Sequence, residues 1–418
     1  MTRAWAIMAI GACLLFALSW FTIQNGWFGR DQLKDTGVYQ AYDAKIRAGQ
    51  VPYRDFAVEY PPLALPVFVV APPAYNDPSG QTFQRGFERV MEACGLALVL
   101  LTALSLARLN EPAGGAASLV LVGLTPLLSG SVILTRFDLW PAALVAAAVA
   151  ALLWELDVLG AILLAIAIAA KLYPAALAPI GLVWVWQRHG RRAAAAWAAT
   201  VVAVTAAAFL PFAILSPGGL GASLSGQLTR PLQVESLGSA VLIALHHVFG
   251  LHLHSATSHG SQNLTGSAAG AVGVASTVLL VLTLLAVWVA FASRPVTERR
   301  LVAAAATAIA TLLAFGKVFS PQFLIWLVPL VPLVRGRRGA AASGLLVAAF
   351  VLTQSWFPHH YWPLALHLAQ PQSWALLARD LVVVGLVALL AWPSLEHDLL
   401  GENRSLLEAL QRVRGQVQ

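Results

Sequence analysis

Long apolar stretches, separated by short polar, Gly- or Pro-containing segments, run along nearly the whole chain. A helix needs about 20 mostly apolar residues to cross the roughly 30 Å hydrocarbon layer of a bilayer. With charges, Gly and Pro taken as boundaries, helical spans are predicted over 4–23, 88–107, 114–134, 139–154, 158–171, 173–187, 194–215, 270–293, 300–316, 322–334, 340–355 and 375–393. The pattern therefore predicts an all-α polytopic membrane protein with about 11–13 transmembrane helices.

Two further apolar stretches, 63–75 and 237–250, are short for a crossing. Pro66, Pro72 and Pro73 also interrupt the first one, and proline breaks a helix interior. We predict that both stretches form interfacial or re-entrant helices in outer loops. If 63–75 crossed the membrane, every later loop would change sides.

The arginines between the spans set the predicted orientation. With 63–75 not crossing, three clusters fall on one side together with both termini: Arg188, Arg191 and Arg192; Arg294, Arg299 and Arg300; Arg335, Arg337 and Arg338. Positive loops mark the cytoplasmic side. The sequence thus predicts one transmembrane domain over 1–395, with a non-cytoplasmic outer loop over 24–88 and a cytoplasmic tail over 396–418.

Composition and charge narrow the class of protein. With 59% hydrophobic and 11% charged residues, a water-soluble fold is excluded, because it would need more polar surface. The net charge of +7 comes from arginines placed as orientation signals, so the expected partner is the lipid bilayer and no nucleic acid. Cys13 and Cys94 lie in apolar runs without metal-ligand spacing. Histidines over 246–259 are irregularly spaced with no acid nearby, so no metal or cofactor is assigned.

The outer loop carries a mixture of charges. Its acids are Asp35, Asp43, Asp55 and Glu59, and its bases are Lys34, Lys45, Arg47 and Arg54. Such a mixture is typical of a solvated surface. Residues 35–49, however, have the spacing of an amphipathic helix that begins beside Asp35 and ends at Gly49. A carboxylate at a helix start is held ionised, which suits a base and a cap alike.

Other ionisable residues interrupt apolar sequence at the same predicted level. Arg136 and Asp138 lie in TRFDLWP, at the junction of two spans, and Lys171 and Lys317 are each followed by a proline. Such groups are costly near hydrocarbon and usually pair or line a polar cavity. The alternatives are a snorkelling lysine, or an interfacial Arg136 paired with its own neighbour Asp138. We favour a cavity.

Two more outer segments add polar groups, namely Arg230 and Glu235 in RPLQVESLGSA, and His359 and His360 before Tyr361. Cations at the level of lipid headgroups suit a phosphate or pyrophosphate on a lipid carrier. A nearby acid can deprotonate a hydroxyl nucleophile. This combination points to glycosyl transfer from a lipid-linked sugar.

Six motifs follow one another along the chain: DxxVY at 35–39, GQVPYRDFAVEYPP at 49–62, TRFD at 135–138, KLYP at 171–174, RPLQVES at 230–236 and FSPQFLIWLVP at 319–329. Together they resemble glycosyltransferase family 87, a family of the GT-C superfamily that includes polyprenyl-phosphate-mannose-dependent mannosyltransferases of actinobacterial envelopes. The resemblance extends to about residue 332, and the order of the motifs carries it.

The resemblance implies a GT-C-like fold and an inverting transfer in which Asp35 is the general base, with Asp55 and Glu59 as alternates. It implies a polyprenyl-phosphate-sugar donor, with mannose the expected sugar, and a glycolipid or glycan acceptor. The groups expected to bind the donor phosphate are Arg136, Lys171, Arg230, Lys317, His359 and His360. Those expected to line the substrate pocket are Tyr39, Tyr60, Asp138, Tyr173, Glu235 and Gln322.

The resemblance also implies a bacterial plasma membrane, and the arginine-based topology puts the active site on its periplasmic or extracellular side. A transporter or flippase of lipid-linked sugars is the main alternative, because a polar cavity with buried cations suits that task as well. Alternating access favours internal repeats, and none is visible in the sequence. A structural subunit of an envelope complex, a third possibility, has no need of Lys171 and Lys317 in apolar surroundings.

Overall fold

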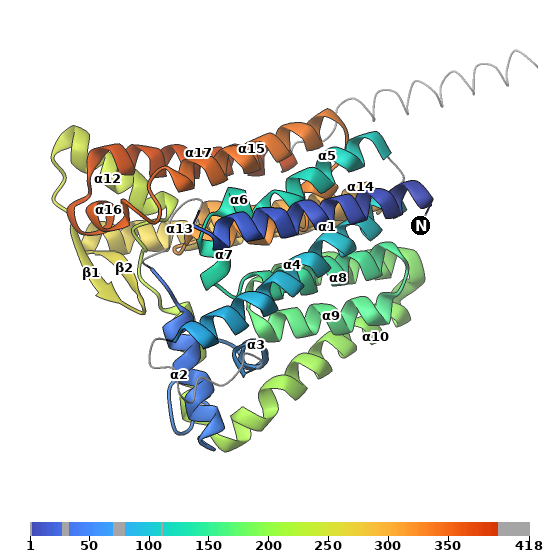
Figure 1. Ribbon diagram of the computed structural model, residues 1–418, viewed down its shortest axis with the longest axis horizontal. Helices are drawn as coiled ribbons and strands as arrows, with labels where there is room; N and C mark the ends of the chain where they lie inside the picture. Colours follow the sequence, from blue (N-terminus) through green and yellow to red (C-terminus); the bar gives the residue numbers. More distant parts are fainter. Residues whose placement is uncertain (1, 27–32, 70–79, 110–111, 392–418) are drawn as a thin grey trace, which may run out of the picture.

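The computed structural model describes residues 2–26, 33–69, 80–109 and 112–391, and nearly all of the described elements are helices (Figure 1). The α-helices are α1 (Arg3–Gln24), α2 (Thr36–Arg47), α3 (Leu65–Val69), α4 (Gln81–Leu109), α5 (Pro112–Gly123), α6 (Thr125–Ser129), α7 (Val132–Thr135), α8 (Leu139–Leu153), α9 (Asp157–Ala170), α10 (Ala178–Leu215), α11 (Pro217–Leu228), α12 (Leu237–Phe249), α13 (Ser267–Ala292), α14 (Glu298–Phe315), α15 (Gly336–Gln354), α16 (Tyr361–His367) and α17 (Gln370–Ala391). The 3₁₀ helices are η1 (Pro62–Ala64), η2 (Tyr173–Leu177), η3 (Pro321–Leu327) and η4 (Val331–Leu333), and the strands are β1 (His254–Ser258) and β2 (Ser261–Thr265).

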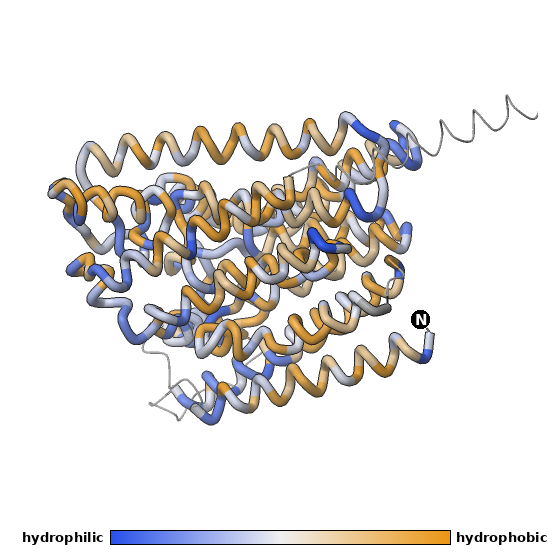
Figure 2. Tube along the Cα trace, turned by 90° about the horizontal axis from the view of Figure 1, so that it is seen from above, coloured by the Kyte–Doolittle hydropathy of each residue, from blue (hydrophilic) through white to orange (hydrophobic). Residues whose placement is uncertain are grey.

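Several described helices are suited to a bilayer. Five are long and apolar enough to cross it, namely Arg3–Gln24, Gln81–Leu109, Tyr173–Leu215, Ser267–Ala292 and Gln370–Ala391. Shorter apolar helices accompany them at Gly114–Gly123, Leu139–Leu153, Asp157–Ala170, Leu237–Phe249 and Pro321–Leu333. Figure 2 shows hydrophobic residues along the helices and hydrophilic ones concentrated toward their ends. The prediction of an all-α polytopic membrane protein is confirmed.

Burial separates the inner helices from the outer ones. Nearly every residue of α8 is buried, as expected of a helix that is apolar on all sides and packs inside the bundle. By contrast, α13 leaves large apolar side chains such as Val274, Val278 and Leu282 exposed. In a membrane protein, such a face meets lipid tails. The bundle therefore has a protein-packed centre and a lipid-facing rim.

The arginine-rich ends of several helices meet at one end of the bundle. Arg108 at the end of α4 makes ion pairs with Glu155 at 3.5 Å and Glu298 at 3.0 Å. Arg188 also pairs with Glu155, and Arg335 lies against the start of α5. The N-terminus lies at the same end in Figure 1. The clusters that the sequence placed on one side are thus at one end of the molecule.

Two predicted spans are interrupted in the structure. The stretch 114–134 is divided into α5, α6 and α7, with Gly130 at a positive φ of 63° between the last two. The side chain of Gln354 fills the space beside Gly130 and donates from Nε2 to the Leu128 carbonyl at 3.0 Å. A contact distant in sequence therefore stabilises a break that hydropathy alone cannot reveal.

The stretch 322–334 was predicted as a single span and instead forms η3 and η4. Pro321, Pro329 and Pro332 remove backbone donors and prevent a continuous α-helix here. The predicted spans 173–187 and 194–215 correspond to η2 and α10, and α10 is kinked at Gly190 (φ 82°, ψ 178°).

The outer segments also depart in part from the sequence prediction. In the described part of 63–75, the chain forms η1 and α3, and 70–75 lie outside the described residues. With 13 residues, α12 is about 20 Å long, less than a bilayer crossing. The loop predicted over 24–88 ends earlier, because α4 begins at Gln81. An antiparallel β1–β2 hairpin lies between α12 and α13, in a segment for which the sequence predicted no helix or strand.

Candidate active site

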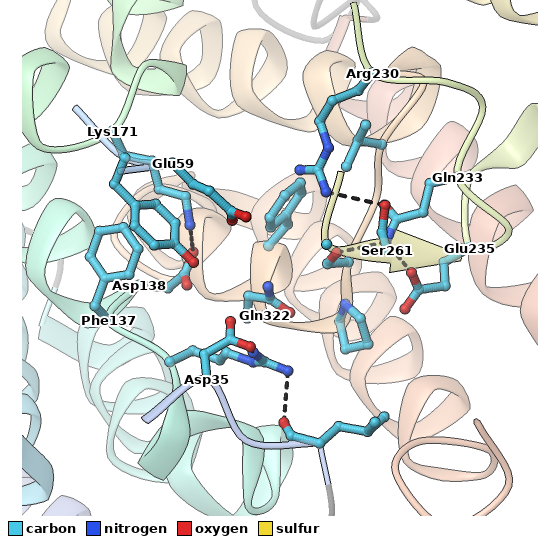
Figure 3. A pocket seen from close by; sticks show the side chains of 18 of the residues that line it. Asp35, Glu59, Phe137, Asp138, Lys171, Arg230, Gln233, Glu235, Ser261 and Gln322 are labelled. Atoms are coloured by element: carbon cyan, nitrogen blue, oxygen red, sulfur yellow. Dashed lines mark hydrogen bonds and ion pairs between the residues drawn. The ribbon is translucent and has the colours of Figure 1, made fainter. Parts of the chain in front are cut away.

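A cavity of about 700 Å³ lies near the end of the bundle that carries α2 and the β-hairpin, away from the N-terminus (Figures 1 and 3). Helix ends and loops from separate parts of the chain line it: 33–39, 59–61, 136–138, 171–173, 227–235, 257–262, 318–326 and 357–362 contribute residues. All six sequence motifs supply part of this wall. Residues that the sequence separates by hundreds of positions therefore face one space.

Asp35 lies immediately before α2 and its side chain does not cap that helix. Instead, its carboxylate makes an ion pair with Arg136, whose Nη2 also donates to the Leu33 carbonyl at 2.8 Å. Tyr39 Oη donates a long hydrogen bond of 3.5 Å to Asp35 Oδ2. The Asp35 side chain remains 32% exposed. It is therefore an oriented, charge-paired carboxylate at the cavity wall (Figure 3).

Asp138 is buried in the cavity wall and accepts two short hydrogen bonds on Oδ1. Lys171 Nζ and Trp326 Nε1 each donate to it at 2.6 Å. Lys171 also lies 4.6 Å from the ring centroid of Phe137 and 5.3 Å from that of Phe323. A buried carboxylate is tolerated only when its charge is compensated. Arg136 and Asp138, neighbours in the sequence, thus have different partners, and the alternative that they pair with each other is wrong.

Aromatic rings form an apolar part of the wall. Trp326 stacks on Tyr173, with ring centroids 4.1 Å apart, and on Phe323 at 3.9 Å. Tyr60 packs edge-on against Phe137 at 4.9 Å. Burial raises the pKa of the Tyr60 hydroxyl, so this group is neutral at physiological pH. The cavity therefore combines charged groups with flat apolar surfaces.

Arg230 differs from the other cavity cations in its partners. One of its Nη2 hydrogen bonds goes to the His259 carbonyl at 2.9 Å and another to Ser261 Oγ at 3.2 Å, both on the β-hairpin. Within the described part of the chain, no carboxylate lies within ion-pair distance of it, and its Nε has no hydrogen-bond partner. Among the described residues, its guanidinium is thus held at the cavity without an ion-pair partner.

Glu235 is buried beside a set of linked polar groups. Its carboxylate accepts from Gln233 Nε2, which also donates to Ser320 Oγ at 2.9 Å, and Gln233 Oε1 accepts from the Phe319 backbone N–H at 3.0 Å. Burial raises the pKa of Glu235 to about 7, although nearby arginines act in the opposite direction. Gln233 therefore ties the Arg230 segment to the loop before η3.

Arg379 supports this wall from behind and was missed in the sequence. It lies fully buried in α17, donates from Nη2 to the Glu235 carbonyl at 2.6 Å and pairs with buried Asp380 at 2.7 Å. It also stacks over the Phe319 ring at 3.7 Å. The available signal was the Arg-Asp pair inside a predicted span, since charges within an apolar helix usually have a function.

The structure brings most predicted site residues to this cavity. Its lining includes Asp35, Tyr39, Glu59, Tyr60, Arg136, Asp138, Lys171, Tyr173, Arg230, Glu235 and Gln322. The remaining predicted residues do not line it. Asp55 pairs with Arg54 at 2.9 Å, which together with a backbone N–H lowers the pKa of the Asp55 carboxyl. Lys317 donates to the Leu228 carbonyl at 3.3 Å, and His359 and His360 are exposed.

No group of three or more His, Cys, Asp or Glu side chains within the described ranges is placed to hold a metal ion. Two of the loop histidines have ordinary polar partners: His246 Nδ1 is 2.6 Å from the Leu251 carbonyl, and His247 Nε2 is 2.9 Å from Ser373 Oγ.

Fold and site together define a helical membrane protein with a charged, aromatic-lined cavity near one end of its bundle. The model of glycosyltransferase family 87 matches residues 58–321, more than half of the chain. The chain therefore belongs to glycosyltransferase family 87. No curated protein matches the chain.

Solved structures with similar overall shape are distant in sequence. ArnT from Cupriavidus metallidurans, solved bound to undecaprenyl phosphate, is 14% identical over 93% of this chain and 77% of its own, with a TM-score of 0.49. The oligosaccharyltransferase of Archaeoglobus fulgidus tethered with an acceptor peptide is 12% identical over 92% of this chain and 55% of its own, with a TM-score of 0.45. AglB from Archaeoglobus fulgidus with an inhibitory peptide and a dolichol-phosphate is 13% identical over 96% of this chain and 52% of its own, with a TM-score of 0.38. The chain thus spans about half the length of the latter two.

Proposed function

We propose that the protein transfers a sugar from a polyprenyl-phosphate donor to a hydroxyl of a glycolipid or glycan acceptor. The observation that carries the proposal is the cavity itself, in which carboxylates and cations from distant segments face one space in a member of a glycosyltransferase family. Such a transfer needs a base for the acceptor hydroxyl and positive charge for the departing phosphate. Both kinds of group are present within this one wall.

The donor phosphate is assigned to Arg136, Lys171 and Arg230. Arg230 is the foremost of these, because its guanidinium has no carboxylate partner among the described residues, while Arg136 and Lys171 are paired with Asp35 and Asp138. A guanidinium donates two parallel hydrogen bonds to a phosphate and remains charged at any physiological pH. The geometry offers no comparable support for Lys317, His359 or His360, because none of them lines the cavity.

Asp35 is the proposed general base. Its carboxylate accepts the proton of the acceptor hydroxyl as that oxygen forms a bond to the anomeric carbon. The bond from that carbon to the phosphate oxygen breaks on the opposite face, polyprenyl phosphate leaves, and the anomeric configuration inverts. Asp55 is the weaker alternate, because it lies outside this cavity, whereas Glu59 lines it.

The direction of the site across the membrane belongs to the same proposal. The arginine clusters gather at the end of the bundle away from the cavity (Figure 1). Positive loops face the cytoplasm, so the cavity faces the periplasm or the outside of a bacterial plasma membrane, with both termini cytoplasmic. Mannose is the sugar proposed, on the resemblance of the motifs to polyprenyl-phosphate-mannose-dependent enzymes.

A direct assay supplies radiolabelled polyprenyl-phosphate mannose and a bacterial membrane lipid extract to the purified protein in detergent. The expected result is release of polyprenyl phosphate together with a labelled, extractable product whose new linkage has the opposite anomeric configuration. Donor that binds and is recovered intact contradicts the proposal and supports a transporter or flippase instead.

A further inference from the structure

A second cavity of about 340 Å³ adjoins the first. It lies between the loop 53–59 and one face of α11, where Gly219, Ala222, Ser223 and Gly226 recur at helical spacing. Glu59, Gln227 and Arg230 line both cavities. These three residues therefore mark the junction where the two spaces meet.

The walls of the second cavity are fixed at both ends of α11. Before the helix, Ser216 Oγ donates to the Tyr53 carbonyl at 2.9 Å, and near the helix end Gln227 Nε2 donates to the Glu59 carbonyl at 2.8 Å. Tyr53 also packs edge-on against Phe212 in α10, at 5.0 Å between ring centroids. The backbone at Tyr53 approaches Gly219 so closely that a side chain there has no room. The cavity is thus a built feature between two clamped elements.

The charges of the second cavity differ from those of the first. Arg54 and Asp55 compensate each other at 2.9 Å. The other two charged side chains, Glu59 and Arg230, have opposite signs and stand at the junction without an ion pair between them. No excess of positive charge is left to attract a phosphate. Carboxylate, amide and backbone carbonyl groups are instead the partners that neutral hydroxyls use for hydrogen bonding.

Glu59 has a further property that suits hydroxyl binding. Among the described residues, its carboxylate has no ion pair or hydrogen bond, although its backbone is held by Tyr42 and Gln227. An ionised carboxylate accepts up to about four hydrogen bonds. The size of the cavity is at the lower end of the range of ligand pockets, roughly 300–1,000 Å³.

We propose that this second cavity binds the sugar or polyol headgroup of the acceptor, with Glu59 holding its hydroxyls at the junction and one hydroxyl reaching into the first cavity toward Asp35. This inference rests on the proposed function, because it names where the second substrate of that transfer binds. The donor occupies the cationic first cavity, so the two substrates approach from different sides of the Glu59–Gln227–Arg230 junction.

A cavity-filling variant with a matched control tests the inference. Gly226 lines the second cavity, and a Cβ added there meets no atom within 4 Å, so Gly226→Leu fills the cavity without an initial clash. Gly221 lies on the same helix, lines neither cavity, and also has open space within 4 Å of an added Cβ. Gly221→Leu therefore makes the same chemical change, with the same gain in helix propensity.

Each variant is measured for binding of undecaprenyl phosphate and for transfer from labelled donor to a bacterial membrane lipid extract. Gly226→Leu is expected to lose roughly tenfold or more in transfer while binding undecaprenyl phosphate as tightly as the wild type. Gly221→Leu is expected to match the wild type in both. Wild-type transfer by Gly226→Leu, or an equal loss of transfer and undecaprenyl phosphate binding, overturns the acceptor assignment alone. A wild-type protein that transfers nothing refutes the proposed function, and the acceptor site with it.

Discussion

Replacing Asp35 by Asn is the sharpest single perturbation of the proposed chemistry. The change removes the base and keeps the size of the side chain. General base catalysis contributes about 10²- to 10⁴-fold to a rate, which corresponds to about 3–5 kcal/mol of activation free energy. We therefore expect kcat to fall by at least about a hundredfold.

The fold should survive this change, because Asn keeps an oxygen that accepts a hydrogen bond from Arg136. The Asp35 side chain is 32% exposed and does not cap α2, but Arg136 is only 10% exposed. Loss of this ion pair therefore costs more than the about 0–1 kcal/mol of an exposed pair and less than the about 3–5 kcal/mol of a fully buried one. The thermal midpoint falls, but undecaprenyl phosphate still binds, because Arg136, Lys171 and Arg230 are unchanged.

The assay follows transfer from labelled polyprenyl-phosphate mannose at saturating donor, alongside the thermal midpoint in detergent. Asp157→Asn is the matched control, since Asp157 pairs with His189 at the arginine-rich end, away from the cavity. That variant should transfer as the wild type does. If Asp35→Asn keeps a kcat within about tenfold of the wild type, Asp35 is not the base. A loss confined to Glu59→Gln would then assign the base to Glu59.

Three further predictions follow from the cavity walls. Arg230→Gln removes a charge-assisted contact, so it should weaken undecaprenyl phosphate binding by roughly 10- to 100-fold in a titration; unchanged affinity refutes its phosphate role. Folding raises the pKa of Glu235 from its ordinary value of 4.5 to about 7. Protonation of this carboxyl therefore favours the folded state, and this contribution to the free energy of unfolding is lost as pH rises from 4.5 through 7. Glu235→Gln should therefore flatten the fall of the thermal midpoint over that range, and an unchanged slope contradicts the assignment. Arg379→Met leaves Asp380 buried without its partner and should cost about 3–5 kcal/mol, largely recovered by adding Asp380→Leu; a double variant as unstable as the single one argues against this.

The sequence could predict where helices occur better than where they break. Long apolar runs have few other uses in a protein, so the membrane class and most spans followed from hydropathy. The break at Gly130 depends on Gln354, more than two hundred positions away, whose side chain fills the space beside it and binds the Leu128 carbonyl. The 3₁₀ geometry of 321–333 follows from three prolines. The sequence-based prediction of a single span there gave more weight to the apolar character of the run than to these prolines.

The sequence could predict which residues line the cavity but not which of them form ion pairs with one another. Arg136 and Lys171 interrupt apolar sequence, where charges are costly, and Asp35 and Arg230 lie in motifs that resemble the family. All four could therefore be selected from the sequence, and all four line one cavity. Their partners depend on tertiary geometry, which pairs Arg136 with Asp35 and leaves Arg230 without a carboxylate among the described residues. Arg379 was overlooked because its span remains apolar on average. Hydropathy averages hide a charged pair of this kind.

The measurement that tests the central claim most directly follows the fate of the sugar–phosphate bond in proteoliposomes. Labelled polyprenyl-phosphate mannose is supplied with acceptor lipid extract on one face of the membrane, and both free polyprenyl phosphate and the location of the label are measured. We predict cleavage of the donor, equal amounts of polyprenyl phosphate and labelled product, and loss of both with Asp35→Asn. Label that moves to the other leaflet while the donor stays intact would contradict a glycosyltransferase and identify a flippase.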